Sequence, residues 1–206
     1  MIRRFDDHTA LLLIDVQKGV DDVAYYGGPM GRMNNPGAKD ALRRLLRAWR
    51  ANGGRVAFTR HDSVEARSPL KLSLESGQQL EGMEVEPSDI AVTKSANSGF
   101  VGTSLALDLR RARVHRLVVA GFFTSVCVET TVRMAGNMGF DTYLVHDACA
   151  TMNRVGPDGT DHDAELVHAL SVANLHGEFC TAISTDDAIA LLDAHADHLE
   201  RVQGNE

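Results

Sequence analysis

The sequence has few cysteines, no excess of positive charge and no long apolar run. Its three cysteines, Cys127, Cys149 and Cys180, are widely spaced and include no Cys-x-x-Cys pair, so neither a disulfide framework nor a zinc ribbon is expected. A formal net charge of -7 leaves no surplus of cations for phosphate groups, so we expect no nucleic-acid partner. No apolar run approaches the roughly 18–20 residues that cross a bilayer, so we expect no membrane contact.

Targeting and nucleotide-binding signals are also missing. The N-terminal stretch MIRRFDDHTALLLIDVQ contains an apolar run that is too short for a signal-peptide core, and no small-residue cleavage site follows it. A cytoplasmic location is therefore the expectation. The segment GFVGTS lacks the spacing and the lysine of a P-loop, so nucleotide binding is not predicted. The length of 206 residues predicts a single domain over 1–206.

Apolar runs typical of buried strands alternate with segments that have helical periodicity. The runs are continuous rather than alternating, which indicates strands covered on both faces and hence a parallel sheet. We predict an α/β fold with three αβα layers and a six-stranded, mainly parallel sheet of the Rossmann-like type. The predicted strands cover 10–14, 55–60, 89–94, 116–121, 140–148 and 178–184. The predicted helices cover 36–54, 104–113, 125–139, 162–177 and 185–199.

Two features of the connections matter for the site. Asn35 is expected to cap the first helix, with Pro36 at its first position. The stretch 61–88 has no clean period and many polar residues, which is typical of a long functional loop.

Three chemically useful side chains follow predicted strands. Asp15 ends the first strand, Lys94 ends the third, and Cys127 comes shortly after the fourth, at the start of a predicted helix. Ligands of open parallel sheets bind beyond the carboxyl ends of the strands, so these three residues are expected to converge at one edge.

The three side chains suit nucleophilic catalysis. A free thiol has a pKa of about 8.5, and a helix start and the Lys94 ammonium are both expected to lower the pKa of Cys127. Asp15 can accept the thiol proton and later deliver it to a leaving nitrogen. Backbone N–H groups in 122–127 can hold a developing oxyanion.

The segments LLLIDVQ, VTKSANSGFVGTSL and VVAGFFTSVCVETTVRMAGNMGF resemble the signature segments of the isochorismatase-like cysteine hydrolases, and the resemblance extends over about 8–192. That superfamily includes nicotinamidases, N-carbamoylsarcosine amidases and streptothricin hydrolases. The resemblance implies that Asp15 is the general acid/base, Lys94 stabilises the thiolate and Cys127 is the nucleophile. It also implies a cis peptide at Phe122–Phe123 and an oxyanion hole made by the N–H groups of Phe123 and Cys127.

The sequence departs from the metal-dependent members. Nicotinamidases carry Asp-x-His after the second strand, whereas this chain has His61-Asp62-Ser63. His162 and His168 are six residues apart, which does not place them on one helix face, and no HExxH motif occurs. We therefore expect no metal and no other cofactor. His61 is expected either in the substrate pocket, close to the catalytic residues, or in a purely structural role.

The pocket itself is predicted less sharply. Gln17, Tyr26, Phe100 and Phe122 are candidate lining residues, and aromatic walls with few polar groups fit a small planar amide or heterocycle. Phe100 and Phe122 fit the hydrophobic core equally well. Cys149 and Cys180 are expected to be inert fillers of the core, and Glu129 and Arg133 are expected to pair across one helical turn.

The presence of Cys127 favours acyl transfer over the isochorismatase reaction, which generally does not depend on a cysteine. Segments around 60–70, 97–105 and 161–179 look most like the streptothricin-hydrolase-like branch, so an amide or lactam substrate is expected. Two alternatives stay open, namely vinyl-ether hydrolysis with Asp15 as the acid and a catalytically silent ligand-binding protein. The family resemblance implies a homodimer or homotetramer, while the loop 71–89 departs from the branch and leaves the substrate unnamed.

Overall fold

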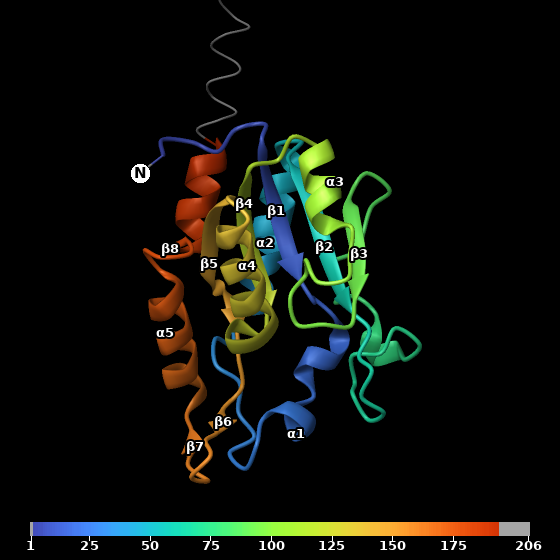
Figure 1. Ribbon diagram of the computed structural model, residues 1–206, viewed down its shortest axis with the longest axis vertical. Helices are drawn as coiled ribbons and strands as arrows, with labels where there is room; N and C mark the ends of the chain where they lie inside the picture. Colours follow the sequence, from blue (N-terminus) through green and yellow to red (C-terminus); the bar gives the residue numbers. More distant parts are fainter. Residues whose placement is uncertain (1, 194–206) are drawn as a thin grey trace, which may run out of the picture.

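The computed structural model describes residues 2–193 and contains one six-stranded sheet with the order β3-β2-β1-β4-β5-β8 (Figure 1). Every neighbouring pair in this sheet is parallel. The strands are β1 (Thr9–Ile14), β2 (Arg55–His61), β3 (Ile90–Lys94), β4 (Arg116–Phe122), β5 (Asp141–Ala150) and β8 (Thr181–Ile183). A separate antiparallel hairpin is formed by β6 (Arg154–Val155) and β7 (Asp161–His162).

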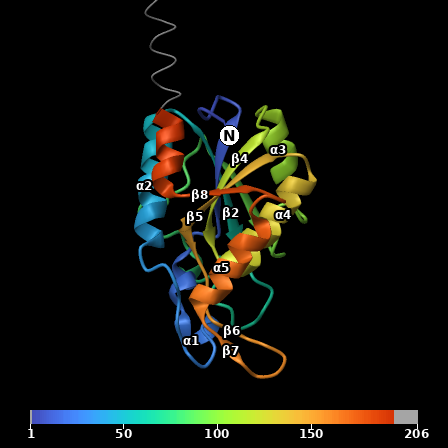
Figure 2. The same ribbon diagram turned by 90° about the vertical axis from the view of Figure 1, so that its left-hand side faces the viewer.

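Helices cover both faces of the sheet, which confirms the predicted three-layer fold. The helix α2 and the helical residues 185–193 lie on one side, and α3 and α4 lie on the other (Figure 2). None of the helices within residues 2–193 is both long and apolar enough to cross a bilayer. The α-helices are α1 (Val23–Tyr26), α2 (Ala38–Ala51), α3 (Leu105–Arg111), α4 (Glu129–Asn137) and α5 (Ala164–Leu175).

The centre of the sheet is the most apolar part of the chain. All six residues of β1 are buried, because β2 and β4 flank it and helices cover it above and below. Leu11 pairs in register with Val56 on one side and Val118 on the other. Burial of a leucine of this kind stabilises the fold by about 1.5–3 kcal/mol, so β1 holds its carboxyl end in a well-defined place.

The first long helix begins later than predicted. The helix α2 starts at Ala38 with Gly37 as its N-cap, so the expected cap at Asn35 and helical start at Pro36 are wrong. Asn35 has a left-handed backbone (φ 44°), and its side-chain amide donates a 2.8 Å hydrogen bond to the carbonyl oxygen of Cys149. A tertiary contact to β5 therefore uses the side chain that the local pattern assigned to the helix.

Other boundaries shift by a few residues. The strand β5 continues to Ala150, two residues beyond its predicted end, and β8 covers only Thr181–Ile183 of the predicted 178–184. The last helix begins at Thr185 as expected, and its predicted part 194–199 lies outside the described residues.

The segment after β4 departs from a regular helix. Residues Thr124–Val128 form a π-helical turn before α4, and the N–H groups of Val126 and Val128 both donate to the carbonyl oxygen of Phe123, at 3.0 and 3.2 Å. The peptide between Phe122 and Phe123 is cis. The sequence pattern predicted one continuous helix here because side-chain periodicity does not distinguish an i→i+5 turn from an α-helical one.

A buried histidine from another element holds the start of this turn. The Nδ1 atom of His168, on α5, lies 2.9 Å from Oγ1 of Thr124, and its Nε2 atom lies 3.4 Å from the amide nitrogen of Asn35. Because the Asn35 nitrogen can only donate, Nε2 accepts, and Nδ1 carries the hydrogen that is donated to Thr124. Burial, and to a lesser extent His146, lowers the pKa of His168 to about 4.

Gly121, near the end of β4, tests how closely β1 and β4 approach. Its φ is +131°, and a Cβ atom there would lie 2.1 Å from the carbonyl oxygen of Ile14, which belongs to the rigid backbone of β1. We expect Gly121→Ala to lower the free energy of unfolding by more than about 3 kcal/mol, measured by urea denaturation. Gly37→Ala is the control, since no atom lies within 4 Å of its Cβ position. A loss below about 1 kcal/mol at Gly121 would contradict the described backbone.

The lowered pKa of His168 predicts acid sensitivity. Between its ordinary pKa of 6.5 and about 4 the unfolded chain binds more protons at this residue than the folded chain. The stabilisation is therefore complete above about pH 6.5 and is lost as the pH falls towards 4, at about 1.4 kcal/mol per pH unit at most. We expect His168→Asn, which keeps a donor for Thr124 but does not titrate, to unfold with a flatter pH dependence in this window. Equal slopes for the two proteins would refute the assignment.

Candidate active site

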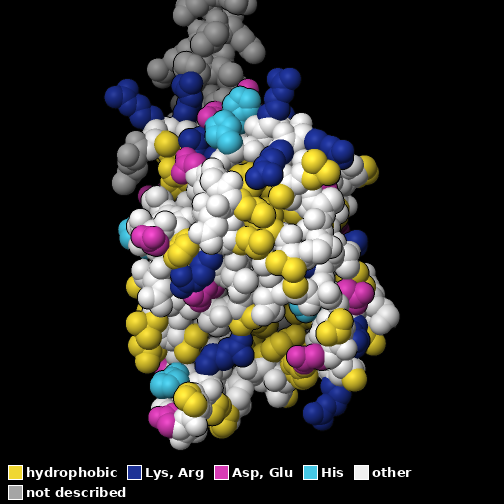
Figure 3. All heavy atoms as spheres, in the orientation of Figure 1, with side chains coloured by type: hydrophobic (Ala, Val, Ile, Leu, Met, Phe, Trp, Pro, Cys, Tyr) yellow, Lys and Arg dark blue, Asp and Glu magenta, His cyan; other side chains and the backbone are white. Residues whose placement is uncertain are grey.

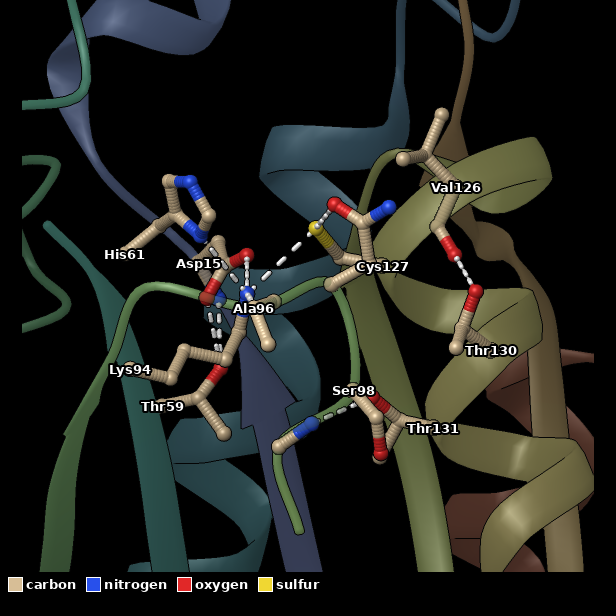
Figure 4. Close-up of polar contacts among 12 residues, drawn as sticks. Asp15, Thr59, His61, Lys94, Ala96, Ser98, Val126, Cys127, Thr130 and Thr131 are labelled. Carbon is tan, nitrogen blue, oxygen red and sulfur yellow. Dashed lines mark hydrogen bonds and ion pairs between the residues drawn. The ribbon is translucent and has the colours of Figure 1, made fainter. Parts of the chain in front are cut away.

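The carboxyl ends of β1, β2, β3 and β4 meet at one edge of the sheet and bring the predicted trio together (Figure 4). Asp15 follows β1, Lys94 is the last residue of β3, and Cys127 lies in the π-helical turn after β4. The convergence follows from the topology. The strands β3, β2, β1 and β4 are consecutive in the sheet and run in the same direction, so their carboxyl ends lie along one edge.

The Lys94 ammonium is the centre of the cluster. Its Nζ atom lies 2.6 Å from Oδ2 of Asp15, 3.4 Å from Sγ of Cys127 and 3.2 Å from the carbonyl oxygen of Ala96. The side chains of Lys94 and Asp15 are 0% and 1% exposed, so the ion pair is fully removed from water. A buried pair of this kind persists only when further hydrogen bonds satisfy both partners.

The Asp15 carboxylate is held from two sides. The Thr59 hydroxyl, on β2, donates a 2.6 Å hydrogen bond to Oδ1 while Lys94 holds Oδ2. The Asp15 backbone is left-handed (φ 51°), and its N–H donates to the carbonyl oxygen of Thr59 at 3.1 Å. These contacts turn the carboxylate across the end of β2 towards the sulfur.

His61 belongs to the same cluster. Its Nδ1 atom lies 3.0 Å from the Lys94 nitrogen. An ammonium can only donate, so Nδ1 accepts and Nε2 carries the hydrogen. Burial, followed by the Lys94 charge, lowers the pKa of His61, which keeps the imidazole neutral. A neutral ring with Nε2–H in the wall of a cavity can donate to a substrate oxygen.

The thiol differs from its prediction. Burial and the Asp15 charge raise the pKa of Cys127 to about 12, and the opposing effect of Lys94 is smaller. The expected thiolate at neutral pH is therefore wrong for the resting site, because that expectation weighed the Lys94 charge but neither the burial of the sulfur nor the opposing charge of Asp15. The sulfur keeps its proton and lies 3.9 Å from Oδ1 of Asn97.

A cavity of about 410 Å³ opens above the sulfur. The face drawn in Figure 3 is hollowed in its lower part, where apolar side chains are exposed between a basic and an acidic group. Of the predicted pocket residues, Tyr26 and His61 lie on the wall, and so does Phe123. The other lining residues are Tyr25, Ser63, Glu65, Ser68, Leu70, Asn97, Val126, Cys127 and Arg154.

Most of these lining residues escaped the sequence analysis. Residues 63–70 lie in the stretch that was predicted to be a functional loop, so the signal located the segment but not its side chains. Arg154 begins the short strand β6 and carries no motif in its surroundings. Only the tertiary structure brings it to the cavity.

Three predicted pocket residues belong to the core instead. Phe122 is 1% exposed, and Phe100 is buried against Phe140 with ring centroids 5.9 Å apart. Gln17 is fully buried, and its amide nitrogen donates to the carbonyl oxygens of His61 and Gly77 at 3.0 and 2.8 Å. The Gln17 side chain thus ties the end of β2 to the loop that follows it. These positions are corrected from lining to structural residues.

Asp15, His61 and Cys127 form the only set of three metal-ligand side chains found among the described residues, with donor atoms within 4.8 Å of one another. The Lys94 ammonium lies within 3.4 Å of a donor atom of each. The three donors already surround a cation, and a divalent ion would have to lie beside that positive charge. The donor set therefore gives no support for a metal site.

Other predicted features lie outside the cavity. Arg133 donates to the Glu129 carboxylate at 2.6 Å, as expected from their spacing on α4, and also lies over the Phe179 ring. Cys149 and Cys180 are buried, and burial raises the pKa of both thiols to about 12. Their environment fits the predicted role as fillers.

The chain is similar in sequence and fold to known proteins of one family. Residues 9–187 match the Isochorismatase domain. A solved structure from Chromobacterium violaceum, a hydrolase of the isochorismatase family by its description, is 41% identical, has a TM-score of 0.85 and covers 92% of this chain and 96% of its own. The uncharacterized isochorismatase family protein YrdC of Bacillus subtilis is 35% identical over 89% of this chain and 96% of its own length.

Two more distant relatives carry names of enzymes. The streptothricin hydrolase of Streptomyces noursei is 31% identical over 74% of this chain and 53% of its own length. The ureidoacrylate amidohydrolase RutB of Agrobacterium fabrum is 28% identical over 73% of this chain and 78% of its own length. With the family match across 9–187 and the parallel sheet that ends in Asp15, Lys94 and Cys127, the chain is a hydrolase of the isochorismatase family.

Proposed function

We propose that this protein is a cysteine hydrolase that cleaves the carbon–nitrogen bond of a small amide or cyclic amide through a thioester. The observation that carries the proposal is the contact of one buried ammonium with both Asp15, at 2.6 Å, and the Cys127 sulfur, at 3.4 Å, beneath a cavity. The names of the amidohydrolase and streptothricin hydrolase relatives agree with this reaction class.

The first step begins from the neutral thiol. The Cys127 proton passes to Asp15, and the sulfur attacks the substrate carbonyl carbon, so a sulfur–carbon bond forms and one electron pair moves to oxygen. The negative charge moves from carboxylate to sulfur and then to oxygen, always close to the Lys94 ammonium. Protonation of Asp15 also removes the carboxylate charge that helps to raise the pKa of Cys127, which lowers the free energy of the thiolate.

The oxyanion requires donors close to the sulfur. We assign this role to the backbone N–H groups of Phe123 and Cys127, which belong to the turn that presents the nucleophile. That turn is held by the hydrogen bonds from Val126 and Val128 to the Phe123 carbonyl, so its N–H groups are preorganised. The Nε2–H group of His61 is a further donor in the wall.

The remaining steps return the site to its resting state. Asp15, now protonated, gives its proton to the departing nitrogen as the carbon–nitrogen bond breaks, which leaves a thioester. A water molecule then gives one proton to Asp15 and adds to the acyl carbon as hydroxide, the sulfur–carbon bond breaks to release the acid, and the thiolate recovers the proton from Asp15. Lys94 keeps its charge throughout and opposes every accumulation of negative charge at the site.

Substitution of the nucleophile tests the proposal. We expect Cys127→Ala to reduce hydrolysis to the uncatalysed background, because no other thiol among residues 2–193 lines the cavity. Cys180→Ala is the matched control and should keep activity within about 3-fold, since Cys180 lies outside the cavity. A screen for ammonia release from primary amides, run beside a ring-opening assay on lactams and cyclic imides, supplies the substrates and separates the two subclasses.

The outcomes of this screen are distinct. Full activity in Cys127→Ala together with cleavage of a vinyl ether would replace the proposal by acid catalysis from Asp15. Tight binding of small amides without any turnover would favour a silent ligand-binding protein.

The acid/base role of Asp15 gives a second test with two readouts. Because the Asp15 carboxylate raises the pKa of Cys127, Asp15→Asn should move the pH dependence of Cys127 alkylation by iodoacetamide to lower pH. The same variant should lose about 10²–10⁴-fold in hydrolysis, because the proton acceptor is gone. Thr59→Val keeps the carboxylate charge and is the control for the pH dependence of alkylation. An alkylation profile that shifts to higher pH in Asp15→Asn would contradict the described electrostatics.

A further inference from the structure

One cation on the cavity wall has no described partner. Arg154 is exposed and lines the cavity together with Cys127, and its guanidinium makes no ion pair or hydrogen bond within residues 2–193. The other charged side chain on the wall is Glu65, whose carboxylate accepts a 2.5 Å hydrogen bond from the Tyr25 hydroxyl. Of the two charged groups on this wall, the guanidinium is therefore the one that a ligand can still pair with.

The segment that carries Arg154 is held firmly in place. The side chain of Asn153 accepts from the Arg32 N–H at 3.2 Å and donates to Asp161 at 2.5 Å. The N–H of Thr151 donates to Asn34 at 2.7 Å, and the backbone of Arg154 pairs with His162 across the hairpin. The backbone on both sides of Arg154 is thus fixed before any ligand binds, as recognition of a ligand group requires.

The groups around the sulfur give the floor of the cavity no net charge. Lys94 is paired with Asp15, the Cys127 thiol is neutral, and His61 is neutral. A neutral ligand that covered Arg154 would remove water from the guanidinium without replacing its hydrogen bonds, which is unfavourable. A carboxylate on the ligand would replace them with two parallel N–H···O contacts.

We propose that Arg154 binds a carboxylate on the substrate, so that the preferred substrates are small amides with an acidic group. This inference rests on the proposed amide hydrolysis and names its substrate class. The cavity of about 410 Å³ accepts a molecule of a few carbon atoms whose amide reaches Cys127 while its carboxylate lies at Arg154.

Paired substrates test the proposal. Succinamate and butyramide share the chain and the amide, and only succinamate carries a carboxylate. We expect the wild-type protein to prefer succinamate, and Arg154→Gln to lower kcat/KM for succinamate about 10–100-fold, mainly through KM, with butyramide changed less than about 3-fold. Arg154→Lys should retain part of the preference, because it keeps the charge but loses the planar fork.

Arg110→Gln is the matched control. It removes the same charge from α3, outside the cavity, and should leave both substrates unchanged. Equal losses for succinamate and butyramide in Arg154→Gln, or a wild-type preference for butyramide, would overturn the proposal while leaving amide hydrolysis by Cys127 intact.

A second measurement does not depend on turnover. Iodoacetate and iodoacetamide both form a sulfur–carbon bond at Cys127 with loss of iodide and of the thiol proton, and they differ in the carboxylate. The rate of Cys127 alkylation by iodoacetate, divided by the rate with iodoacetamide, can be followed by mass spectrometry. This ratio should fall at least about 5-fold in Arg154→Gln. An unchanged ratio would count against the anion site, whereas a fallen ratio without hydrolysis of any amide would keep the site and refute the proposed reaction.

Discussion

The buried contact between the Lys94 ammonium and the Asp15 carboxylate is the interaction on which the site depends. It joins the ends of β3 and β1 and leaves both side chains without access to water. Removal of one partner from such a pair typically costs about 3–5 kcal/mol, because the other charge stays buried. Thr59 and His61 supply the further hydrogen bonds that make the pair tolerable in the interior.

This pair also acts on the sulfur. The two charges act on Cys127 in opposite directions, and burial then favours the neutral thiol. A resting thiol is less exposed to adventitious alkylation and oxidation than a thiolate, since the thiolate is the reactive form. In the proposed reaction, the nucleophile forms only when a carbonyl carbon is in place to receive the electrons, and the ammonium is already positioned for the charge that develops.

Local patterns predicted the architecture well and the turn chemistry poorly. Apolar runs identified all six strands of the sheet, and the clearest runs are β1 and β4, which are buried on both faces almost throughout. The start of α2 was misplaced because Asn35 contacts β5, and the π-helical turn around Cys127 was missed because side-chain periodicity barely registers one extra residue per turn. The sequence left Phe100 and Phe122 open between pocket and core, because an aromatic side chain beside a site can face either, and the structure places both in the core.

The sequence by itself determined the sheet, its parallel direction and the meeting of Asp15, Lys94 and Cys127 at one edge, because each follows from strand ends and crossover rules. Only the tertiary structure decided the protonation of the thiol, the tautomers of His61 and His168, and the side chains of the cavity wall. Those properties depend on burial and on distances between segments far apart in the chain. The wall, for example, combines residues near 25, 65, 97 and 154, and no local pattern links them.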